Sequence, residues 1–516
     1  MSKRASYREG VGFGALSFGA MGMLGIASSI AIARVYGVNV LGQFALVMAP
    51  VNAAWFLSTV KERPGFVAEL ASLHPRHPRV TGLFLAVFAF SFVLTLLVGS
   101  LALVASYFLF KGPVGHPELI APTAVNLAGY VFITNTCFNY DTVLSGFRAG
   151  RQLFWLRLHQ AVAFLAVAVA LGFVWGDVWG LVVATIASWF TTLIHRLVVI
   201  RPFMHAWVSR EEIREGMKTL REIITFGLKI TPGGIFDGIS NEAGTWVLGI
   251  FSSVNTVGAY NRAWTLGRRF MELNWRISEM LFPTLVERRA KGDAHGFDRA
   301  LVDSLRYSAA GMLLPAAAAG GAAYGVMSLF GPGFEGVTGA LTLILLMPAT
   351  STISSLQRHA LYAVNRPVTA SASATIRLVV TVGLCVPLSL LVGTTGTAAA
   401  VVLGFAADSA YMFRVTRGHL ATPLLQLWPL RSILAIAGAY AAGFAAARVV
   451  YDMLETVPGL IVALAAGSVA YAGVFAMLGG VHKRDVERFA SLWERARERA
   501  RRRGSPGPLS TEPTPP

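Results

Sequence analysis

The chain contains few charged residues and few cysteines, and both shortages limit the classes of protein to which it can belong. Asp, Glu, Lys and Arg make up only 14% of its 516 residues, whereas an average soluble domain has about 25%. An ordinary soluble globular protein is therefore excluded. The 2 cysteines, Cys137 and Cys385, fall inside apolar runs, so no disulfide framework is expected.

Motifs typical of enzymes and metal sites are missing as well. The sequence contains no P-loop, no HExxH, no paired CxxC and no GxSxG motif. His74 and His77 lie close together, but the proline-broken loop around them supplies no third ligand. We therefore expect no catalytic residues, no cofactor and no bound metal, and we interpret the chain as a protein that is not an enzyme.

Apolar residues are abundant, at 54% of the chain. Runs of about 20 apolar residues, the length that spans a bilayer as a helix, recur along nearly the whole sequence. They predict an all-α polytopic membrane protein with 12–14 transmembrane helices. The lower number applies if 223–251 and 257–284, which contain charged residues, lie on the membrane surface. The expected segments are 11–36, 39–60, 80–109, 119–141, 153–175, 178–200, 223–251, 257–284, 305–331, 336–360, 368–391, 396–414, 432–450 and 457–480.

The distribution of positive charge predicts the orientation. Most of the 44 Lys and Arg fall in the N-terminus, in the connections after even-numbered helices and in the C-terminus. The opposite loops hold only Arg34, Lys111 and Arg448. Because positive residues are retained in the cytoplasm, both termini are expected there. The net charge of +17 then reflects topology and attraction to anionic lipids, and no nucleic-acid partner is expected.

A short motif occurs twice, 216 positions apart, as "VNVLGQF" and "VNTVGAY". Arg148 and Arg366, each between two apolar runs, form a second pair 218 positions apart. The two offsets indicate duplicated halves with the same orientation, related by an axis along the membrane normal. We interpret the motif as the outer hairpin of each half. Its matched residues are Val38, Asn39, Gly42 and Phe44 in the first copy and Val254, Asn255, Gly258 and Tyr260 in the second.

The duplication and the composition divide the chain into five parts. We expect the last part to form a basic surface helix that binds anionic lipids, followed by a disordered tail. The parts are six helices (1–200), an amphipathic cytoplasmic linker (201–222), six more helices (223–415), an additional helix pair (432–480) and the basic segment (481–516).

Ionisable residues inside the segment 223–251 mark a candidate functional region, because charges within a membrane usually face a cavity or a partner. Asp237 lies five residues after the Pro232 break and one turn before Asn241. We therefore predict Asp237, Asn241 and Glu242 as candidates for coupling transport to H⁺ or Na⁺.

The next segment carries Arg262, Arg269 and Arg276, spaced by seven residues. On a helix they form a stripe about 40° wide, and each step rises about 10 Å. We call these three residues the arginine stripe and predict that it binds an anion. Arg268 is expected to pair with Glu272. The alternative is that these arginines only neutralise acidic residues of the two segments, namely Asp237, Glu242, Glu272 and Glu279.

The sequences "IARVYGVNVLGQFALVMAP", "VNTVGAYNRAWTLGRRF" and "ISEMLFPTLVERRAKGD" resemble the polysaccharide flippases of the multidrug/oligosaccharidyl-lipid/polysaccharide exporter superfamily. The resemblance implies two six-helix lobes around a central cavity. It also implies transfer of undecaprenyl-pyrophosphate-linked oligosaccharides across the bacterial inner membrane, in lipopolysaccharide or exopolysaccharide biosynthesis with polymerase or export machinery. Arg262, Arg268, Arg269 and Arg276 would meet the pyrophosphate or acidic sugars, and Arg34 would lie at the outer mouth.

Three alternatives to this function stay open. A lipid II flippase would share the helix count and a basic cavity. A cation-coupled multidrug exporter would favour an acidic cavity, for which Asp237 and Glu242 are available. A membrane glycosyltransferase or polymerase would need larger external loops than this chain provides.

Overall fold

The computed structural model consists of helices and connecting turns. It describes residues 7–60, 62–205, 207–228, 231–364, 366–423, 428–480 and Glu494, without the side chains of 7–20, 272–280 and a few other helical positions. No strand occurs among these residues, so the all-α class predicted from the sequence is confirmed. The basic segment expected at 481–516 lies outside the described residues, apart from Glu494.

Every apolar segment expected from the sequence falls on one or more helices. The first helices are α1 (Tyr7–Leu57), α2 (Glu62–Ser72), α3 (Pro78–Lys111), α4 (Ile120–Gly129), α5 (Asn135–Gly146), α6 (Gly150–Val174), α7 (Val178–Ile200) and α8 (Arg210–Leu228). They are followed by α9 (Thr231–Phe251), α10 (Val254–Ala290), α11 (Ala294–Gly321), α12 (Ala323–Ser328), α13 (Thr338–Ile344), α14 (Met347–Ala363), α15 (Pro367–Arg417), α17 (Leu430–Leu454) and α18 (Val457–Met477). Short 3₁₀ turns occur at Pro117–Leu119, Arg201–Phe203 and Glu335–Val337, and a π-helical turn, Tyr130–Thr134, joins α4 to α5.

Two of the longest helices, α1 and α15, are interrupted by a glycine. Gly37 has φ 72° and Gly393 has φ 62°, in the left-handed region that favours glycine. After Gly393 the chain packs back on itself, because a Cβ atom at Gly396 would overlap the carbonyl oxygen of Leu388. Each interrupted helix therefore supplies two segments rather than one.

Eight helices in the described part of the chain are long and apolar enough to cross a membrane. Met21–Leu57 and Ser371–Arg417, which contain the two glycine interruptions, are among them. The more charged helices α9 and α10 are not. However, α9 packs against α1 and α15, and α10 packs against α1 and α14. Both lie within the bundle rather than on its surface, and the chain is a multi-pass membrane protein.

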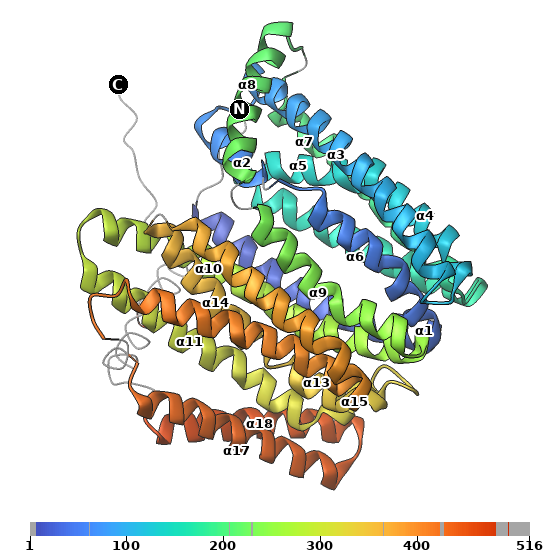
Figure 1. Ribbon diagram of the computed structural model, residues 1–516, viewed down its shortest axis with the longest axis vertical. Coiled ribbons are helices and arrows are strands. Elements are labelled where there is room, and N and C mark those ends of the chain that lie inside the picture. The colour runs from blue at the N-terminus through green and yellow to red at the C-terminus, as the bar shows by residue number, and fades with distance from the viewer. Residues whose placement is uncertain are drawn as a thin grey trace, which may run out of the picture.

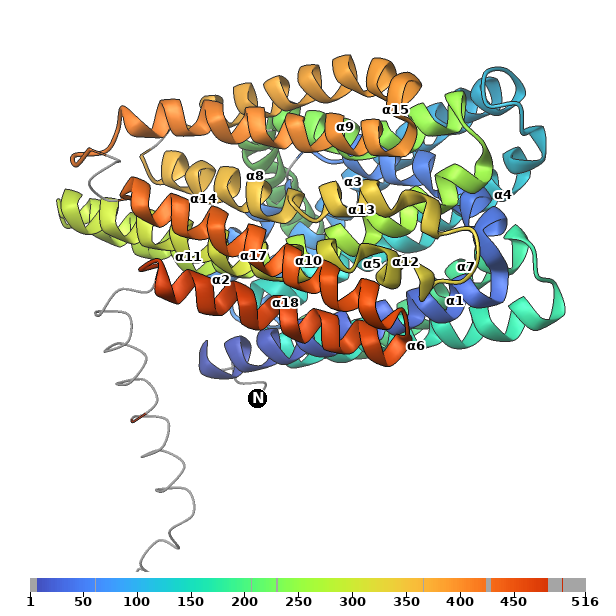
Figure 2. The ribbon, with the colours of Figure 1, turned by 90° about the horizontal axis from the view of Figure 1, so that it is seen from below.

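The helices form two groups that meet along α1, α9 and α10 (Figure 1). In the N-terminal group α1 packs on α3, α4, α6 and α7, and in the C-terminal group α10 packs on α11, α13 and α14. The pair α17–α18 packs on α11, on the side away from α3 (Figures 1 and 2). The largest cluster of buried apolar side chains crosses from one group to the other through Tyr36, Leu46, Val257 and Tyr260.

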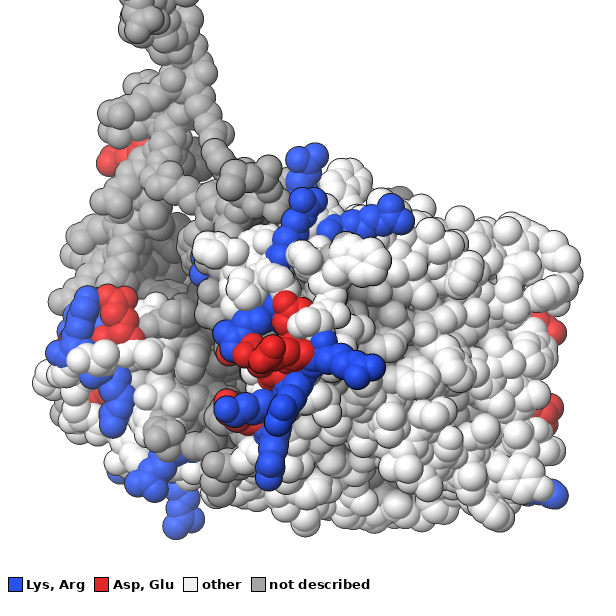
Figure 3. All heavy atoms as spheres, turned by 90° about the horizontal axis from the view of Figure 1, so that it is seen from above, with Lys and Arg blue, Asp and Glu red and all other residues white. Residues whose placement is uncertain are grey.

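The helix α8 lies against α2 and α3 and carries a large share of the surface charge. Gly65 and Gly82 leave room for it, because a Cβ atom at either position would come within 3.0 Å of Ile223 or of Glu212. Figure 3 shows most of the charged side chains in the left half and middle of the view and a few at the right edge, with a broad uncharged surface between them. This separation is what a protein embedded in a bilayer requires.

Candidate functional site

The two copies of the repeated motif contact each other. Asn39 Nδ2 donates to Asn255 Oδ1 at 3.0 Å. A Cβ atom at Gly42 would overlap the carbonyl oxygen of Val254, and one at Gly258 would overlap that of Val38. The contacts are reciprocal, as a pseudo-twofold relation between the halves requires. We call this contact, Val38–Gly42 against Val254–Gly258, the outer crossing.

Arg34 joins the N-terminal group to a loop of the C-terminal group near the outer crossing. Its Nε donates to the carbonyl oxygen of Leu329 at 2.9 Å, and its Nη2 lies 3.5 Å from that of Ser328. The side chain is exposed. Arg34 is therefore engaged by backbone carbonyls and is separate from the arginines of α10.

Two residues of the arginine stripe, Arg262 and Arg269, face the first segment of α1. Arg262 Nη1 donates to Ser29 Oγ at 3.2 Å, and Nη2 donates to the preceding asparagine at 3.1 Å. Among the described residues no carboxylate pairs with Arg262. The guanidinium of Arg269 lies 3.0 Å from where a Cβ atom at Gly25 would be, so glycine leaves room for it. As residue numbers rise along α10 they fall along this part of α1, and both arginines lie at the interface between the two groups.

Arg268 points to α9 instead. Its Nη1 lies 3.8 Å from Glu242 Oε1, and the side chains are 41% and 5% exposed, respectively. One predicted neutralising pair between α9 and α10 therefore exists. The side chains of Glu272, Glu279 and Arg276 lie outside the described residues, so the predicted pair between Arg268 and Glu272 stays a prediction.

An apolar groove of about 230 Å³ lies between α1 and α9. Phe56 of α1, Trp246 of α9 and Val382 of α15 line it, and Glu242 is the one ionisable residue among those described there. The neighbouring Asn241 has a buried Oδ1 without a hydrogen-bond partner among the described residues. This α1–α9 groove combines an apolar wall with a nearly buried acid.

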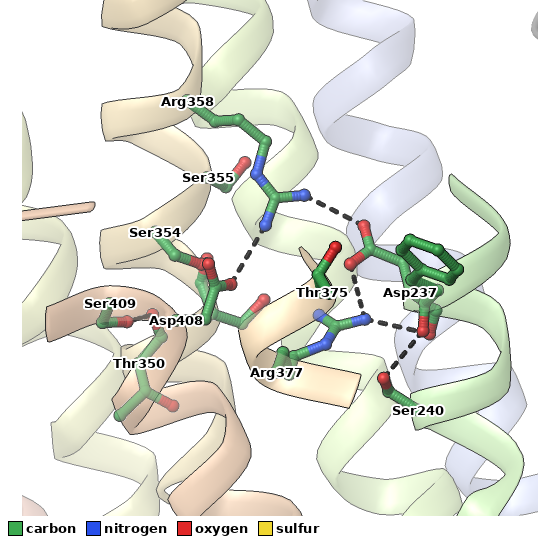
Figure 4. A network of polar contacts seen from close by, with 12 residues as sticks. Asp237, Ser240, Thr350, Ser354, Ser355, Arg358, Thr375, Arg377, Asp408 and Ser409 are labelled. Carbon is green, nitrogen blue, oxygen red and sulfur yellow. Dashed lines mark hydrogen bonds and ion pairs between the residues drawn. The ribbon is translucent and has the colours of Figure 1, made fainter. Parts of the chain in front are cut away.

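Asp237 belongs to a four-residue charge network inside the C-terminal group (Figure 4). Its carboxylate lies 2.9 Å from Arg358 of α14 and 2.8 Å from Arg377 of α15. Arg358 also contacts Asp408 of α15 at 3.0 Å, and Arg377 donates to the backbone oxygen of Asp237 at 2.9 Å. The network contains two positive and two negative side chains, so its formal charge is balanced.

Sequence analysis overlooked three members of this network. The sequence alternative paired Asp237 with arginines of α10, whereas its partners among the described residues come from α14 and α15. All three are charged residues inside predicted apolar segments, and that is the signal by which the sequence could have revealed them. Arg358 falls at the end of 336–360, Arg377 in 368–391 and Asp408 in 396–414. Applying that criterion to every segment would have found all three.

The described part of the chain offers no metal-binding cluster, since no three His, Cys, Asp or Glu converge in it. His77 lies next to α3 and its ring nitrogen accepts a hydrogen bond from the backbone N–H of Arg79 at 3.2 Å. It thus caps a helix.

Solved structures with this arrangement of helices are membrane transporters. The lipid II flippase MurJ in an inward closed conformation matches 90% of this chain and 98% of its own, with TM-score 0.63 and 14% identity. An inward-facing multidrug resistance MATE family transporter of the MOP superfamily matches 80% of this chain and 98% of its own, with TM-score 0.57 and 16% identity. An outward-facing structure of a multidrug resistance MATE family transporter of the MOP superfamily matches 80% of this chain and 93% of its own, with TM-score 0.51 and 15% identity. The fold is therefore that of MOP-superfamily transporters.

The family follows from the sequence itself. A family model described as polysaccharide biosynthesis protein matches residues 32–324, more than half of the chain. The chain belongs to this family, which confirms the resemblance carried by the repeated motif and the α10 sequence. No curated protein matches it significantly.

Proposed function

We propose that this protein moves an undecaprenyl-pyrophosphate-linked oligosaccharide across the bacterial inner membrane for surface polysaccharide biosynthesis. Membership of the polysaccharide biosynthesis family and the transporter fold support this function. MurJ, the protein of the first structure compared, is named as a flippase of a lipid-linked substrate. The protein acts as a transporter and catalyses no chemical reaction.

The observation that carries the proposal is the placement of Arg262 and Arg269 on α10, against α1. Two phosphate groups must cross a layer where an unpaired charge costs at least several kcal/mol. Arg262 has neutral described partners, so its charge remains available to an anion. The pyrophosphate would meet Arg276 first, then Arg269, and Arg262 near the exit, at intervals of about 10 Å.

The α1–α9 groove suits the polyprenyl chain of such a substrate. Its walls are apolar, and Leu57 and Ile239 are 39% and 42% exposed. A polyprenyl chain must stay in an apolar environment while its headgroup is bound between the two groups of helices. In this proposal the groups are two lobes around a central cavity, both termini are cytoplasmic, and the outer crossing closes the periplasmic side.

Coupling to H⁺ or Na⁺ is assigned in this proposal to the acidic side of α9. Asp237 already contacts two guanidinium groups, so a cation would have to displace them. Glu242 has a buried Oε1 without a hydrogen-bond partner among the described residues, and Arg268 lies 3.8 Å away. Glu242, with Asn241 beside it, is therefore the stronger candidate and Asp237 the weaker one.

A lipid II flippase is the second candidate, favoured by the fold shared with MurJ. Deletion of the gene, followed by analysis of lipid-linked intermediates, separates the candidates. The proposed function predicts loss of surface polysaccharide and accumulation of the completed undecaprenyl-pyrophosphate-linked oligosaccharide. Accumulated lipid II would instead identify a peptidoglycan precursor flippase.

Two other results of the deletion would overturn transport of a lipid-linked sugar altogether. Unchanged lipid-linked pools with increased drug sensitivity would identify a multidrug exporter. An intermediate lacking one sugar would identify a glycosyltransferase.

A further inference from the structure

A second groove lies on the N-terminal group, away from α10. It has a volume of about 580 Å³ and is formed by α6 and α7. Its polar lining residues are Arg151, Gln152, His159 and His195, and Trp155 and Val162 are among its apolar ones. Trp155 is 50% exposed and Val162 is 48% exposed, so the groove faces outward from the bundle.

The two helices bring positive charge to this groove and no negative charge. Neither α6 nor α7 contains Asp or Glu. The buried Arg196 is already paired, since its guanidinium donates to both carboxylate oxygens of Asp141 at 2.8 and 2.9 Å. Arg151 is exposed and forms no ion pair among the described residues. The groove therefore complements an anion.

The histidine pair supplies a further hydrogen-bond donor. The Nδ1 atoms of His159 and His195 lie 3.1 Å apart, so one donates and the other accepts. A ring that accepts at Nδ1 carries its proton on Nε2, and that N–H is a donor.

These groups lie toward one end of the two helices, where a lipid headgroup would be expected. Arg151 lies in the first turn of α6, and His159 lies eight residues further, about 12 Å along the helix axis. His195 is five residues before the end of α7, which leads toward α8. A phosphate between Arg151 and the histidines would be near the membrane boundary and at the level of Trp155, with Val162 beside the upper part of its acyl chains.

We propose that the α6–α7 groove binds an anionic phospholipid of the surrounding membrane through its headgroup phosphate. The occupant is a membrane phospholipid because the groove opens toward lipid and combines an apolar wall with unneutralised positive charge. This site does not depend on the transported substrate, so it stands or falls separately from the proposed function.

Lipid retention by the purified full-length protein tests the proposal. The probe is phosphatidylglycerol, compared with phosphatidylcholine of the same acyl chains, and bound lipid is counted by native mass spectrometry. Combined Arg151→Gln and His159→Gln substitutions should weaken phosphatidylglycerol binding at least about tenfold, as expected when charged hydrogen bonds are lost. The matched control is Arg157→Gln, an exposed arginine of α6 that does not line the groove.

If Arg157→Gln lost as much phosphatidylglycerol binding as the double variant, or if the unmodified protein retained both lipids equally, the protein would attract anionic lipids only diffusely. Either result would overturn the proposed site. Displacement of phosphatidylglycerol by undecaprenyl phosphate at equal concentration would assign the groove to the carrier lipid, and displacement by inorganic phosphate would assign it to free phosphate. Either result rejects the phospholipid.

A second measurement requires no change to the polar residues. Phosphatidylglycerol with brominated acyl chains should quench the fluorescence of Trp155, obtained as the difference between the unmodified protein and Trp155→Phe. Absence of quenching specific to Trp155 contradicts the proposal.

Discussion

A guanidinium group inside a helical bundle is stable only where oxygen atoms surround it, and this protein meets that need in two ways. Arg358 and Arg377 lie within 3.0 Å of carboxylates in a balanced network. Arg262 instead donates to a serine hydroxyl and an asparagine side chain. Only the second arrangement leaves a positive charge for a ligand.

The arginine stripe predicts a difference between Arg and Lys at its middle position. Arg269→Ala should abolish export, and Arg269→Lys should impair it although the charge is kept, because Lys cannot make bidentate contacts to phosphate. The measurement is recovery of surface polysaccharide in the deletion strain, with immunoblots to compare membrane insertion. Normal export by Arg269→Ala, or activity that returns only when Asp237 or Glu242 is also neutralised, would show that the stripe is structural.

The charge network predicts a large loss of stability when one partner is removed. Asp237→Asn leaves two arginines with one buried acid, which should cost about 3–5 kcal/mol and lower the thermal unfolding midpoint of the purified protein. The double variant Asp237→Asn, Arg377→Met restores charge balance and should recover part of this loss. Additive losses of stability in the double variant would contradict the network.

The same variant also tests coupling. If Asp237→Asn transports with the normal dependence on the ion gradient, Asp237 has no role in coupling.

At the scale of elements, the repeated motif brings the backbones of α1 and α10 into close contact. Its glycines lie where a Cβ atom would overlap the backbone of the other copy. The hydrogen bond between Asn39 and Asn255 adds a polar contact at the same place. The outer crossing is therefore a backbone-to-backbone contact, and a single methyl group is enough to disturb it.

Substituting either glycine should open the outer crossing. Gly42→Ala and Gly258→Ala each place a methyl group against a carbonyl oxygen, an overpacking that costs about 1–3 kcal/mol. We expect faster reaction of a thiol reagent with Val257→Cys, a buried position beside Gly258, in both variants, measured after Cys137 and Cys385 are replaced by alanine. The matched control is Gly22→Ala in α1, where a Cβ atom meets nothing within 4 Å. Labelling rates equal to the control would show that the contact does not close this side.

The whole molecule has a broad uncharged surface between a larger charged region and a few charged side chains at the opposite edge (Figure 3). α8 packs on α2 and α3 at the top of the view, and the α17–α18 pair covers α11 away from the N-terminal group (Figure 1). This polarity belongs to the complete assembly of helices. The side of the membrane that each connection faces is predicted from the bias of Lys and Arg among the connections.

Orientation gives a prediction at this scale. Reporter tags inserted after Lys111 and at Gly393 should report the periplasm, and tags at His77, at Lys291 and at the C-terminus should report the cytoplasm, because positive residues are retained there. Alkaline phosphatase and fluorescent protein fusions measure this directly. A periplasmic C-terminus would reverse the assignment.

The sequence by itself determined the properties that depend on neighbouring residues. Apolar runs and charge bias define the segments, and a spacing of seven places Arg262, Arg269 and Arg276 along one face of α10, because helix geometry is regular. The repeat of Asn39 and Asn255 was also visible as a pattern.

Only the tertiary structure decided which of these residues meet. Asn39 and Asn255 bond across 216 positions, Asp237 pairs with Arg358 and Arg377, and the α6–α7 groove joins His159 to His195. A helix exposes several faces of similar polarity. Which face meets a given partner is set by the packing of the whole bundle, and local sequence does not contain that information.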